Sequence, residues 1–281
     1  MYNAINDFDR FPPDIGSVVP RSMIEAAVGL EAFLTIPLSA ELKLHRRRDF
    51  DRVRKPVDGK RGHKTGKFHT RKDPRRPVIM NESFVGERWR NLYYEVHPSI
   101  LRHLDQRFIV EINDRNGACW AVPDSYLEGS DGTFAICEGK TALIFEFLPE
   151  GGKKLVRGLT DRVQNQQLRI QDAFRQAGHI YEVFDQAWSA HPIRTGNIRK
   201  ILSATKKLPF GVAERLAMER LLRGDDLTVG DCAREFAGRG DCPEEWICAA
   251  MGNGVLEIDF DRPIDRASRV SLPSPPFWSD R

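Results

Sequence analysis

The middle of the chain constrains the fold most, because its hydrophobic pattern changes there from helical to strand-like spacing. Residues 82–104 carry apolar side chains at helical spacing, and Pro98 is expected to divide this helix into two pieces. Alternating segments separated by glycine-containing turns then predict strands over residues 107–113, 118–127, 133–137 and 141–148. A helix over 164–177, a strand over 180–184 and a helix over 193–203 complete this part. The order predicts a mixed α/β layer architecture.

The ends of the chain have helical spacing. Residues 22–34 predict a short amphipathic helix or docking element. After residue 209, three short helices (212–222, 229–237 and 243–251) and a strand over 255–260 suggest a winged-helix or other helix-turn-helix variant. The third helix carries two glutamates and no Lys or Arg, which suits a DNA groove poorly. A role in contacting another protein is therefore at least as well supported for this module as DNA binding.

Charge is distributed unevenly along the 281 residues. The net charge is +3, but residues 41–76 contain 15 Lys and Arg against 5 Asp and Glu, so this segment carries +10 and the remainder −7. Glycines and prolines interrupt the basic segment and exclude a long helix. Such a segment suits contact with a phosphate backbone, although a solvated linker is the alternative. The DNA-contacting candidates are Arg54, Lys55, Lys60, Arg61, Lys64, Lys67, Arg71 and Lys72.

Several protein classes do not fit this sequence. The most apolar stretch, residues 23–38, is interrupted by two glutamates, so no membrane span is expected. The first residues show no basic and apolar signal pattern, which indicates a cytoplasmic protein. The five cysteines are odd in number and form no Cys-x-x-Cys pair, so a disulfide framework or a zinc knuckle is not expected.

The most specific motif is Pro123-Asp124 followed by Glu138-Gly-Lys140. Counting across the predicted hairpin places residue 124 opposite about residue 137, so a one-residue bulge or slip is needed to bring Glu138 onto the face of Asp124. The two carboxylates then suit Mg²⁺ or Mn²⁺. Lys140, two residues further on, shares the strand face of Glu138 and suits stabilisation of developing negative charge.

A second acidic strand competes with this one. Glu146-Phe-Leu148-Pro149 lies on a clearer apolar strand, but leucine stands where the motif has lysine. The complete motif favours Glu138 and Lys140, whereas the strand context favours Glu146. Both alignments, and with them Glu138 or Glu146 as the second metal ligand beside Asp124, stay open from sequence.

The motifs, in order, resemble those of TnsA-type endonuclease subunits of Tn-seven-like heteromeric transposases, members of the PD-(D/E)xK nuclease superfamily. The resemblance spans roughly residues 54–202. It includes the basic Gly-Lys-Phe-His-Thr-Arg-Lys segment at 66–72, Glu-Ser at 82–83 before Glu87-Arg88, the Pro-Asp and Glu-x-Lys motifs, and Phe174, Gly178 and Tyr181-Glu-Val183. Gln106 is followed by Arg107 where the family usually has proline.

This resemblance implies a restriction-endonuclease-like core with a mixed central sheet flanked by helices. It implies Glu87 as a helix carboxylate, Asp124 as the metal-bridging acid, Glu138 as the second strand ligand and Lys140 as the catalytic lysine. It also implies Mg²⁺-dependent cleavage of double-stranded DNA at transposon ends in bacteria, together with a DDE-type transposase. An AAA+ ATPase regulator would bind the C-terminal domain.

Three parts are therefore expected: an N-terminal segment with the basic arm (1–76), a nuclease core (77–207) and a small winged-helix-like partner-binding domain (208–281). The favoured function is a metal-dependent endonuclease subunit. The first alternative is a catalytically impaired DNA-binding and assembly subunit, which the leucine at 148 would explain. The second is a repair or restriction nuclease that works without a transposase.

Overall fold

The computed structural model describes residues 33–53, 66–81, 87–140, 143–147, 153–158, 161–185, 191–224, 226–240 and 242–278. The chain forms two compact units from non-consecutive stretches. Unit 1 comprises residues 1–87, 102–127 and 134–186, and unit 2 comprises residues 88–101, 128–133 and 187–281. Both strands and helices are present, so the predicted α/β class with mixed sheets is confirmed.

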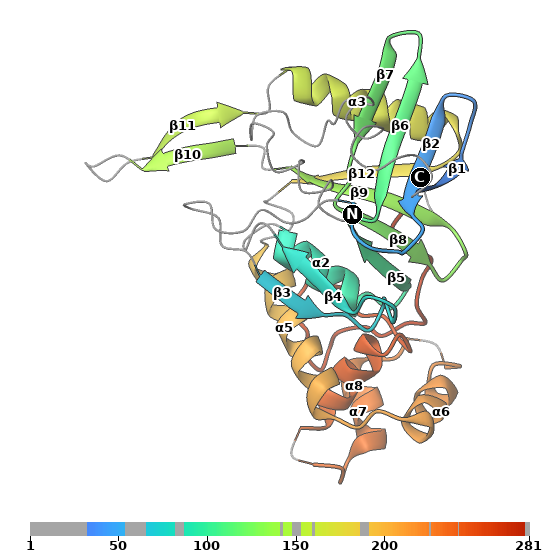
Figure 1. The fold of residues 1–281 in the computed structure, drawn as a ribbon. Coiled ribbons are helices and arrows are strands. Elements are labelled where there is room, and N and C mark those ends of the chain that lie inside the picture. Colours follow the sequence, from blue (N-terminus) through green and yellow to red (C-terminus); the bar gives the residue numbers. More distant parts are fainter. Residues whose placement is uncertain are drawn as a thin grey trace. The chain divides into compact units, whose positions relative to one another are not determined.

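The first sheet has the strand order β1-β2-β6-β7 and is antiparallel throughout (Figure 1). Its strands are β1 (Phe33–Pro37), β2 (Leu42–Arg47), β6 (Phe108–Asp114) and β7 (Gly117–Ala121). The long apolar run of β6 is explained by burial on both faces. Phe108, Val110 and Ile112 pack into one core cluster, while Ile109 packs into another with Trp120.

The second sheet has the order β12-β9-β8-β5. Its strands are β5 (Ile100–Asp105), β8 (Ser125–Gly129), β9 (Phe134–Lys140) and β12 (Ile180–Asp185), and β12 runs parallel to β9. Helix α3 (Asp161–Gln176) supplies Ile170 and Phe174 to the cluster that also contains residues of β2, β6, β9 and β12. One apolar core therefore joins both sheets and α3.

Two further sheets are two-stranded antiparallel pairs. The first joins β3 (Gly66–His69) to β4 (Val78–Asn81), and the second joins β10 (Leu143–Phe147) to β11 (Lys153–Gly158). Strand β11 was not expected from the sequence.

Unit 2 is mainly helical. Its helices are α2 (Glu87–Val96, whose first residue belongs to unit 1), α5 (Pro192–Lys207), α6 (Val212–Leu221), α7 (Val229–Ala233), the 3-10 turn η4 (Arg234–Phe236) and α8 (Pro243–Gly252). Helices α5 and α8 approach closely, since a Cβ on Gly252 would lie 2.1 Å from Thr205 Oγ1. Phe236 and Trp246 stack with ring centroids 5.4 Å apart.

Several local predictions are wrong. Residues 33–34 begin β1, where pairing with β2 outweighs the expected helical spacing, and the rest of the expected 22–34 helix lies outside the described residues. The piece after Pro98 is strand β5 because it joins the second sheet. The expected strand over 118–127 is two strands, since Pro123 lacks the N–H that a ladder needs. Residues 255–260 form only an isolated bridge, between Glu257 and Ser271.

One part of the basic segment forms a strand that the sequence did not predict. Residues 42–47 form β2, which hydrogen-bonds to β1 on one side and β6 on the other. This part is therefore built into the first sheet, because its alternating leucines, Leu42 and Leu44, are buried in the core. In the described part of the chain, no helix is long and apolar enough to cross a membrane.

Candidate active site

The β8–β9 hairpin brings Asp124 and Glu138 together. The backbone N–H of Asp124 donates to Glu138 Oε2 at 3.1 Å, and the backbone N–H of Gly139 donates to Asp124 Oδ2 at 2.8 Å. Each carboxylate is thus held by the backbone of the segment that carries the other. Such reciprocal, charge-assisted hydrogen bonds fix two carboxylates side by side.

The turn of this hairpin explains the register. Gly129 N–H donates to Thr133 C=O at 2.9 Å, and Gly132 has a φ of 81°, a conformation that favours glycine. Counting back along both strands from the 129–133 pair places residue 124 opposite residue 138. The expected bulge or slip is therefore not needed. The pairing of Gly129 with Thr133 shifts the register by one residue from the pairing assumed from sequence.

The two carboxylates differ in burial. The side chain of Asp124 is half-buried, whereas Glu138 lies on an inner strand and is only 2% exposed. Val183 of β12 pairs with Glu138 in the parallel ladder. A buried carboxylate is costly unless it is hydrogen-bonded or bound to a cation. This burial distinguishes Glu138 from an ordinary surface glutamate.

Tyr181 and Gln167 also belong to this site, and sequence reasoning assigned them no role. The hydroxyl of Tyr181 on β12 donates to Gln167 Oε1 on α3 at 2.9 Å, and both side chains are buried. Burial raises the pKa of Tyr181 well above its ordinary value, and the nearby Glu138 and Asp124 raise it further. Tyr181 therefore remains a neutral phenol beside the carboxylates. The parallel pairing of β9 and β12 creates this proximity, and no local sequence pattern predicts it.

Gln106 supports Asp124 from the other side. It forms the reversal between β5 and β6 with a φ of 48°, an uncommon conformation for a residue other than glycine. Its N–H donates to the carbonyl of Asp124 at 2.9 Å, and its own carbonyl accepts from Val53 N–H at 2.9 Å. A residue keeps such a backbone conformation when its surroundings hold it there. Both the N–H and the carbonyl of Gln106 are hydrogen-bonded.

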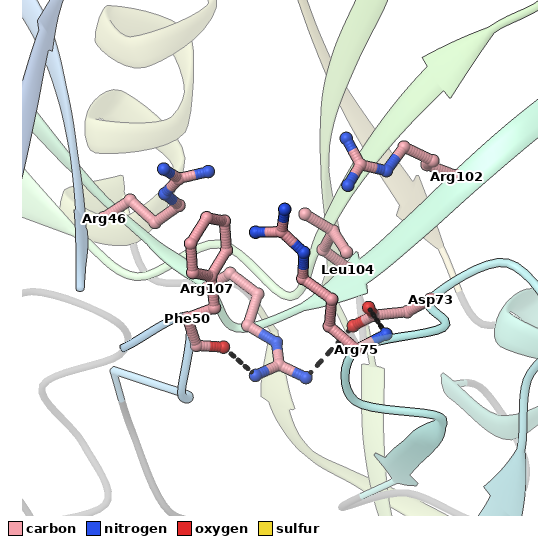
Figure 2. A pocket seen from close by; sticks show the side chains of 7 residues that line it. All are labelled: Arg46, Phe50, Asp73, Arg75, Arg102, Leu104 and Arg107. Carbon is pink, nitrogen blue, oxygen red and sulfur yellow. Dashed lines mark hydrogen bonds and ion pairs between the residues drawn. The ribbon is translucent and has the colours of Figure 1, made fainter. Parts of the chain in front are cut away.

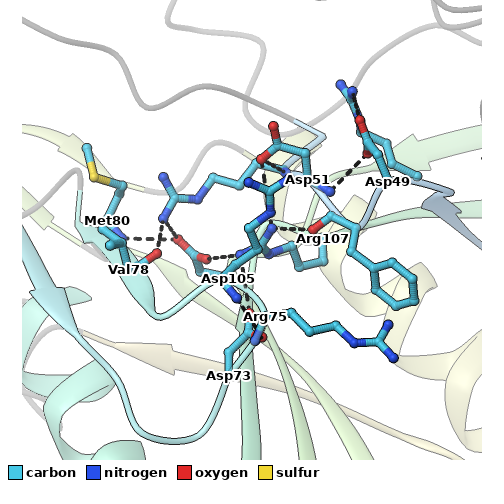
Figure 3. Close-up of polar contacts among 12 residues, drawn as sticks. Asp49, Asp51, Asp73, Arg75, Val78, Met80, Asp105 and Arg107 are labelled. Carbon is cyan, nitrogen blue, oxygen red and sulfur yellow. Dashed lines mark hydrogen bonds and ion pairs between the residues drawn. The ribbon is translucent and has the colours of Figure 1, made fainter.

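A buried ion network holds this reversal in place. Arg107, 4% exposed, donates to the carbonyl of Phe50 and, at 3.3 Å, to Asp73 Oδ2 (Figure 2). Its guanidinium also lies 3.7 Å from Asp105 Oδ1, and Asp105 pairs in addition with Arg52 (Figure 3). Burial raises the pKa of Asp105, and the neighbouring guanidiniums of Arg52 and Arg107 counter this effect.

Arg107, the residue after Gln106, thus has a structural role. Asp73 accepts from the backbone N–H groups of Arg75 and Arg76, both at 3.2 Å, and Asp105 accepts from Met80 N–H at 3.1 Å. The network therefore ties the segment before β4 to the reversal that contacts Asp124.

The donor chemistry of the hairpin fits a hard divalent cation. Asp124 and Glu138 supply carboxylate oxygens, and Mg²⁺ commonly uses one or two carboxylates, with waters and substrate phosphates as its remaining ligands. Among the described residues there is no group of three or more His, Cys, Asp or Glu side chains that could hold a metal ion. Two carboxylates would supply only part of a coordination shell, so a Mg²⁺ ion held there would need further ligands.

The remaining predicted site residues are Glu87, Glu146 and Lys140, and only Lys140 shares a strand with Glu138. Glu87 is the first residue of α2 and is half-buried. Glu146 lies on β10, in the separate two-stranded sheet, where it pairs with Lys154 of β11. Lys140 ends β9 and pairs with Asp185, but its side chain lies outside the described part. The structure thus brings Asp124 together with Glu138 and places Glu146 in a different sheet.

The predicted DNA-contacting residues divide into two groups. Lys67 is exposed on β3, and Arg71 and Lys72 follow in the β3–β4 connection, exposed and half-buried respectively. The other candidates lie outside the described residues: Arg54, Lys55, Lys60, Arg61 and Lys64.

No protein-family model matches the chain, and the comparison with curated proteins finds no match either.

Proposed function

We propose that the protein is a metal-dependent DNA endonuclease subunit of a transposase, which hydrolyses phosphodiester bonds at transposon ends. The observation that carries this proposal is the reciprocal pairing of Asp124 and Glu138 on the β8–β9 hairpin. These are the two acids of the Pro-Asp and Glu-x-Lys motifs, so the contact joins the residues through which the chain resembles TnsA-type subunits.

The fold proposed for unit 1 is the PD-(D/E)xK nuclease core. Its support is the mixed sheet in which β9, carrying Glu138, lies between β8 and the parallel strand β12. For the C-terminal part, the proposal is a winged-helix-like domain that binds the ATPase regulator. Helices α6, α7 and α8 and the acidic first turn of α8, with Glu244 and Glu245, support a protein-contacting role.

In the proposed reaction, Asp124 and Glu138 would hold Mg²⁺ or Mn²⁺. The cation, when bound, supplies Lewis-acid polarisation of the scissile phosphate and a lowered pKa for a water. Backbone donors hold one oxygen of each carboxylate, which fixes both side chains on the β8–β9 hairpin. Lys140, the last residue of β9, would stabilise the negative charge that develops on the phosphate.

The proposed partners are double-stranded transposon-end DNA, a DDE-type transposase and an AAA+ ATPase, acting at the bacterial nucleoid. Exposed cations of β3 and of the connection that follows it, Lys67 and Arg71, support contact with the phosphate backbone. These contacts position DNA without reading its sequence.

A second candidate is a catalytically impaired DNA-binding and assembly subunit. Glu138 is almost fully buried and already accepts a hydrogen bond, and the described residues offer no group of three acids, histidines or cysteines for a metal. Both observations favour a structural role for the pair.

A nicking assay on a transposon-end duplex, with the neighbouring transposase and Mg²⁺ present, separates the two candidates. The endonuclease proposal expects cleavage by the wild type and its loss in Asp124→Ala, with DNA binding retained. Undiminished cleavage by Asp124→Ala would show that another site is responsible. Absence of cleavage by the wild type, with intact DNA binding, would favour the assembly subunit.

A matched control is Asp172→Ala. Asp172 is an exposed acid on α3 whose recorded partner is Arg175 of the same helix. Its removal is expected to change neither cleavage nor binding. Substituting Mn²⁺ for Mg²⁺ and then adding EDTA tests the cation requirement directly.

A further inference from the structure

A small pocket in unit 1 is lined mainly by arginines. Its walls are formed by Arg46, Phe50, Asp73, Arg75, Arg102, Leu104 and Arg107 (Figure 2). Two guanidiniums lie over the Phe50 ring, with Arg46 Cζ 3.8 Å and Arg75 Cζ 4.2 Å from its centroid. These cation–π contacts bring two positive groups to one aromatic ring.

The ring is held by an unusual backbone conformation. Phe50 has a φ of 59°, which is rare for a bulky residue. The Arg107 guanidinium donates to the Phe50 carbonyl, so the buried ion network fixes the residue on which the other two arginines stack. The pocket and the network thus share Phe50, Asp73 and Arg107.

The arginines of the pocket differ in their partners. Arg107 is paired with Asp73, the one acid of the lining, whose other oxygen accepts two backbone N–H groups. Within the described part of the chain, no carboxylate forms an ion pair with Arg46 or Arg75. The buried Nε of Arg46 has no hydrogen-bond partner there.

The local environment disfavours the charge on Arg46. Burial lowers the pKa of Arg46, and the like charges of Arg75 and Arg102 lower it further. Guanidinium groups that form no ion pair with a described acid, here those of Arg46 and Arg75, are complementary to an anion, and their planar donor geometry fits two oxygens of a phosphate. An anion in the pocket would supply the missing acceptors and remove the repulsion.

The position of the pocket favours a phosphate of DNA as that anion. Leu104 and Arg107 flank the reversal whose Gln106 N–H contacts the carbonyl of Asp124. Arg75 belongs to the same β3–β4 connection as Arg71 and Lys72. The pocket lining and the backbone of Asp124 therefore both contact the short connection between β5 and β6.

We propose that the pocket around Phe50 binds one backbone phosphate of DNA, outside the scissile bond, through Arg46 and Arg75. The choice of DNA as the polymer rests on the proposed function. By fixing one phosphate, the pocket would set how the duplex lies relative to Asp124 and Glu138.

The test measures binding of a fluorescein-labelled duplex by anisotropy in EDTA, over a series of salt concentrations. Arg46→Ala/Arg75→Ala is expected to weaken binding about tenfold and to reduce the slope of log K against log salt by about one, irrespective of sequence. The control Arg175→Ala removes an exposed arginine of α3 and is expected to change neither quantity. Unchanged affinity and slope in the double alanine variant would overturn the proposal.

A charge-conserving variant covers the case in which the alanine protein does not fold. Arg46→Lys/Arg75→Lys keeps both charges but loses the planar donors, so an intermediate loss of affinity is expected and full affinity would overturn the proposal. Competition with inorganic phosphate, a 5′-phosphorylated end and an oligoglutamate peptide identifies the anion. The proposal expects an internal DNA phosphate to be the ligand. It would be contradicted if the arginines were needed only for binding free phosphate, only for the 5′ end or only for the peptide.

This experiment is separate from the cleavage assay. If the double variant loses affinity while the wild type cleaves nothing, the pocket proposal stands and the endonuclease proposal fails. If the wild type cleaves but the double variant binds DNA normally, the pocket proposal alone fails.

Discussion

Two hairpins, β8–β9 and β10–β11, each carry a glutamate that is a candidate for the second metal ligand from sequence alone. In the β8–β9 hairpin, Glu138 is buried and bonded to the backbone of Asp124. In the β10–β11 hairpin, Glu146 is paired in register with Lys154 in a separate two-stranded sheet. The candidate site is therefore distinguished by the hydrogen-bonded pair of carboxylates on the β8–β9 hairpin, and not by how apolar the strand is.

The first test removes the buried ion pairs of Arg107, which hold the connection that contacts Asp124. Arg107→Met would leave Asp105 and Asp73 without one of their cations, and loss of one partner of a buried ion pair costs about 3–5 kcal/mol. Urea unfolding followed by circular dichroism checks this. Arg175→Met, which removes an exposed pair within α3, is expected to cost less than about 1 kcal/mol. Equal stability of the two variants would contradict a supporting role for the network.

The second test compares the two glutamates directly. Glu138→Gln keeps the side-chain shape but removes the charge, and is expected to lower the cleavage rate about a thousandfold, or about 4 kcal/mol, because a bound metal supplies several kcal/mol. Glu146→Gln is expected to leave the rate unchanged. Single-turnover cleavage with the transposase present measures both. The reverse result would assign the site to β10.

The third test concerns the lysine of each alignment. Lys140→Ala is expected to lower cleavage about a hundredfold, or about 2.7 kcal/mol, the loss typical of one transition-state donor. Adding Leu148→Lys to that variant is expected to restore nothing if β9 carries the site. Recovery of cleavage in the combined variant would favour the β10 alignment instead.

The sequence predicted much of this fold because its signals are local. The helices over 161–176 and 192–207 and strands β6, β9, β10 and β12 follow from spacing and turn residues. Strand β5 was mistaken for a helix because its membership of the second sheet depends on distant partners. Tyr181 was not assigned to the site for the same reason, since only the parallel pairing of β12 with β9 brings it near Glu138.

The candidate acids were also predicted, but their register was not. Asp124 and Glu138 were named from the motif, whereas the register depends on which residues of the Gly-Ser-Asp-Gly turn pair. Local sequence patterns do not decide whether Glu138 or Glu146 is the second metal ligand, because both lie in segments that predict strands. Only the placement of those strands in different sheets separates them.

The smallest expected effect tests the turn that sets this register. Gly132 has a φ of 81°, and a Cβ there would meet nothing within 4 Å, so Gly132→Ala is expected to destabilise the protein by about 1 kcal/mol through backbone conformation alone. Gly196 lies within α5 with equally open surroundings but ordinary helical φ, so Gly196→Ala is expected to stabilise by about 0.5–1 kcal/mol. Thermal unfolding measures both. Destabilisation by Gly132→Ala together with stabilisation by Gly196→Ala would support the left-handed turn that aligns residue 124 with residue 138. Stabilisation by both substitutions would contradict it.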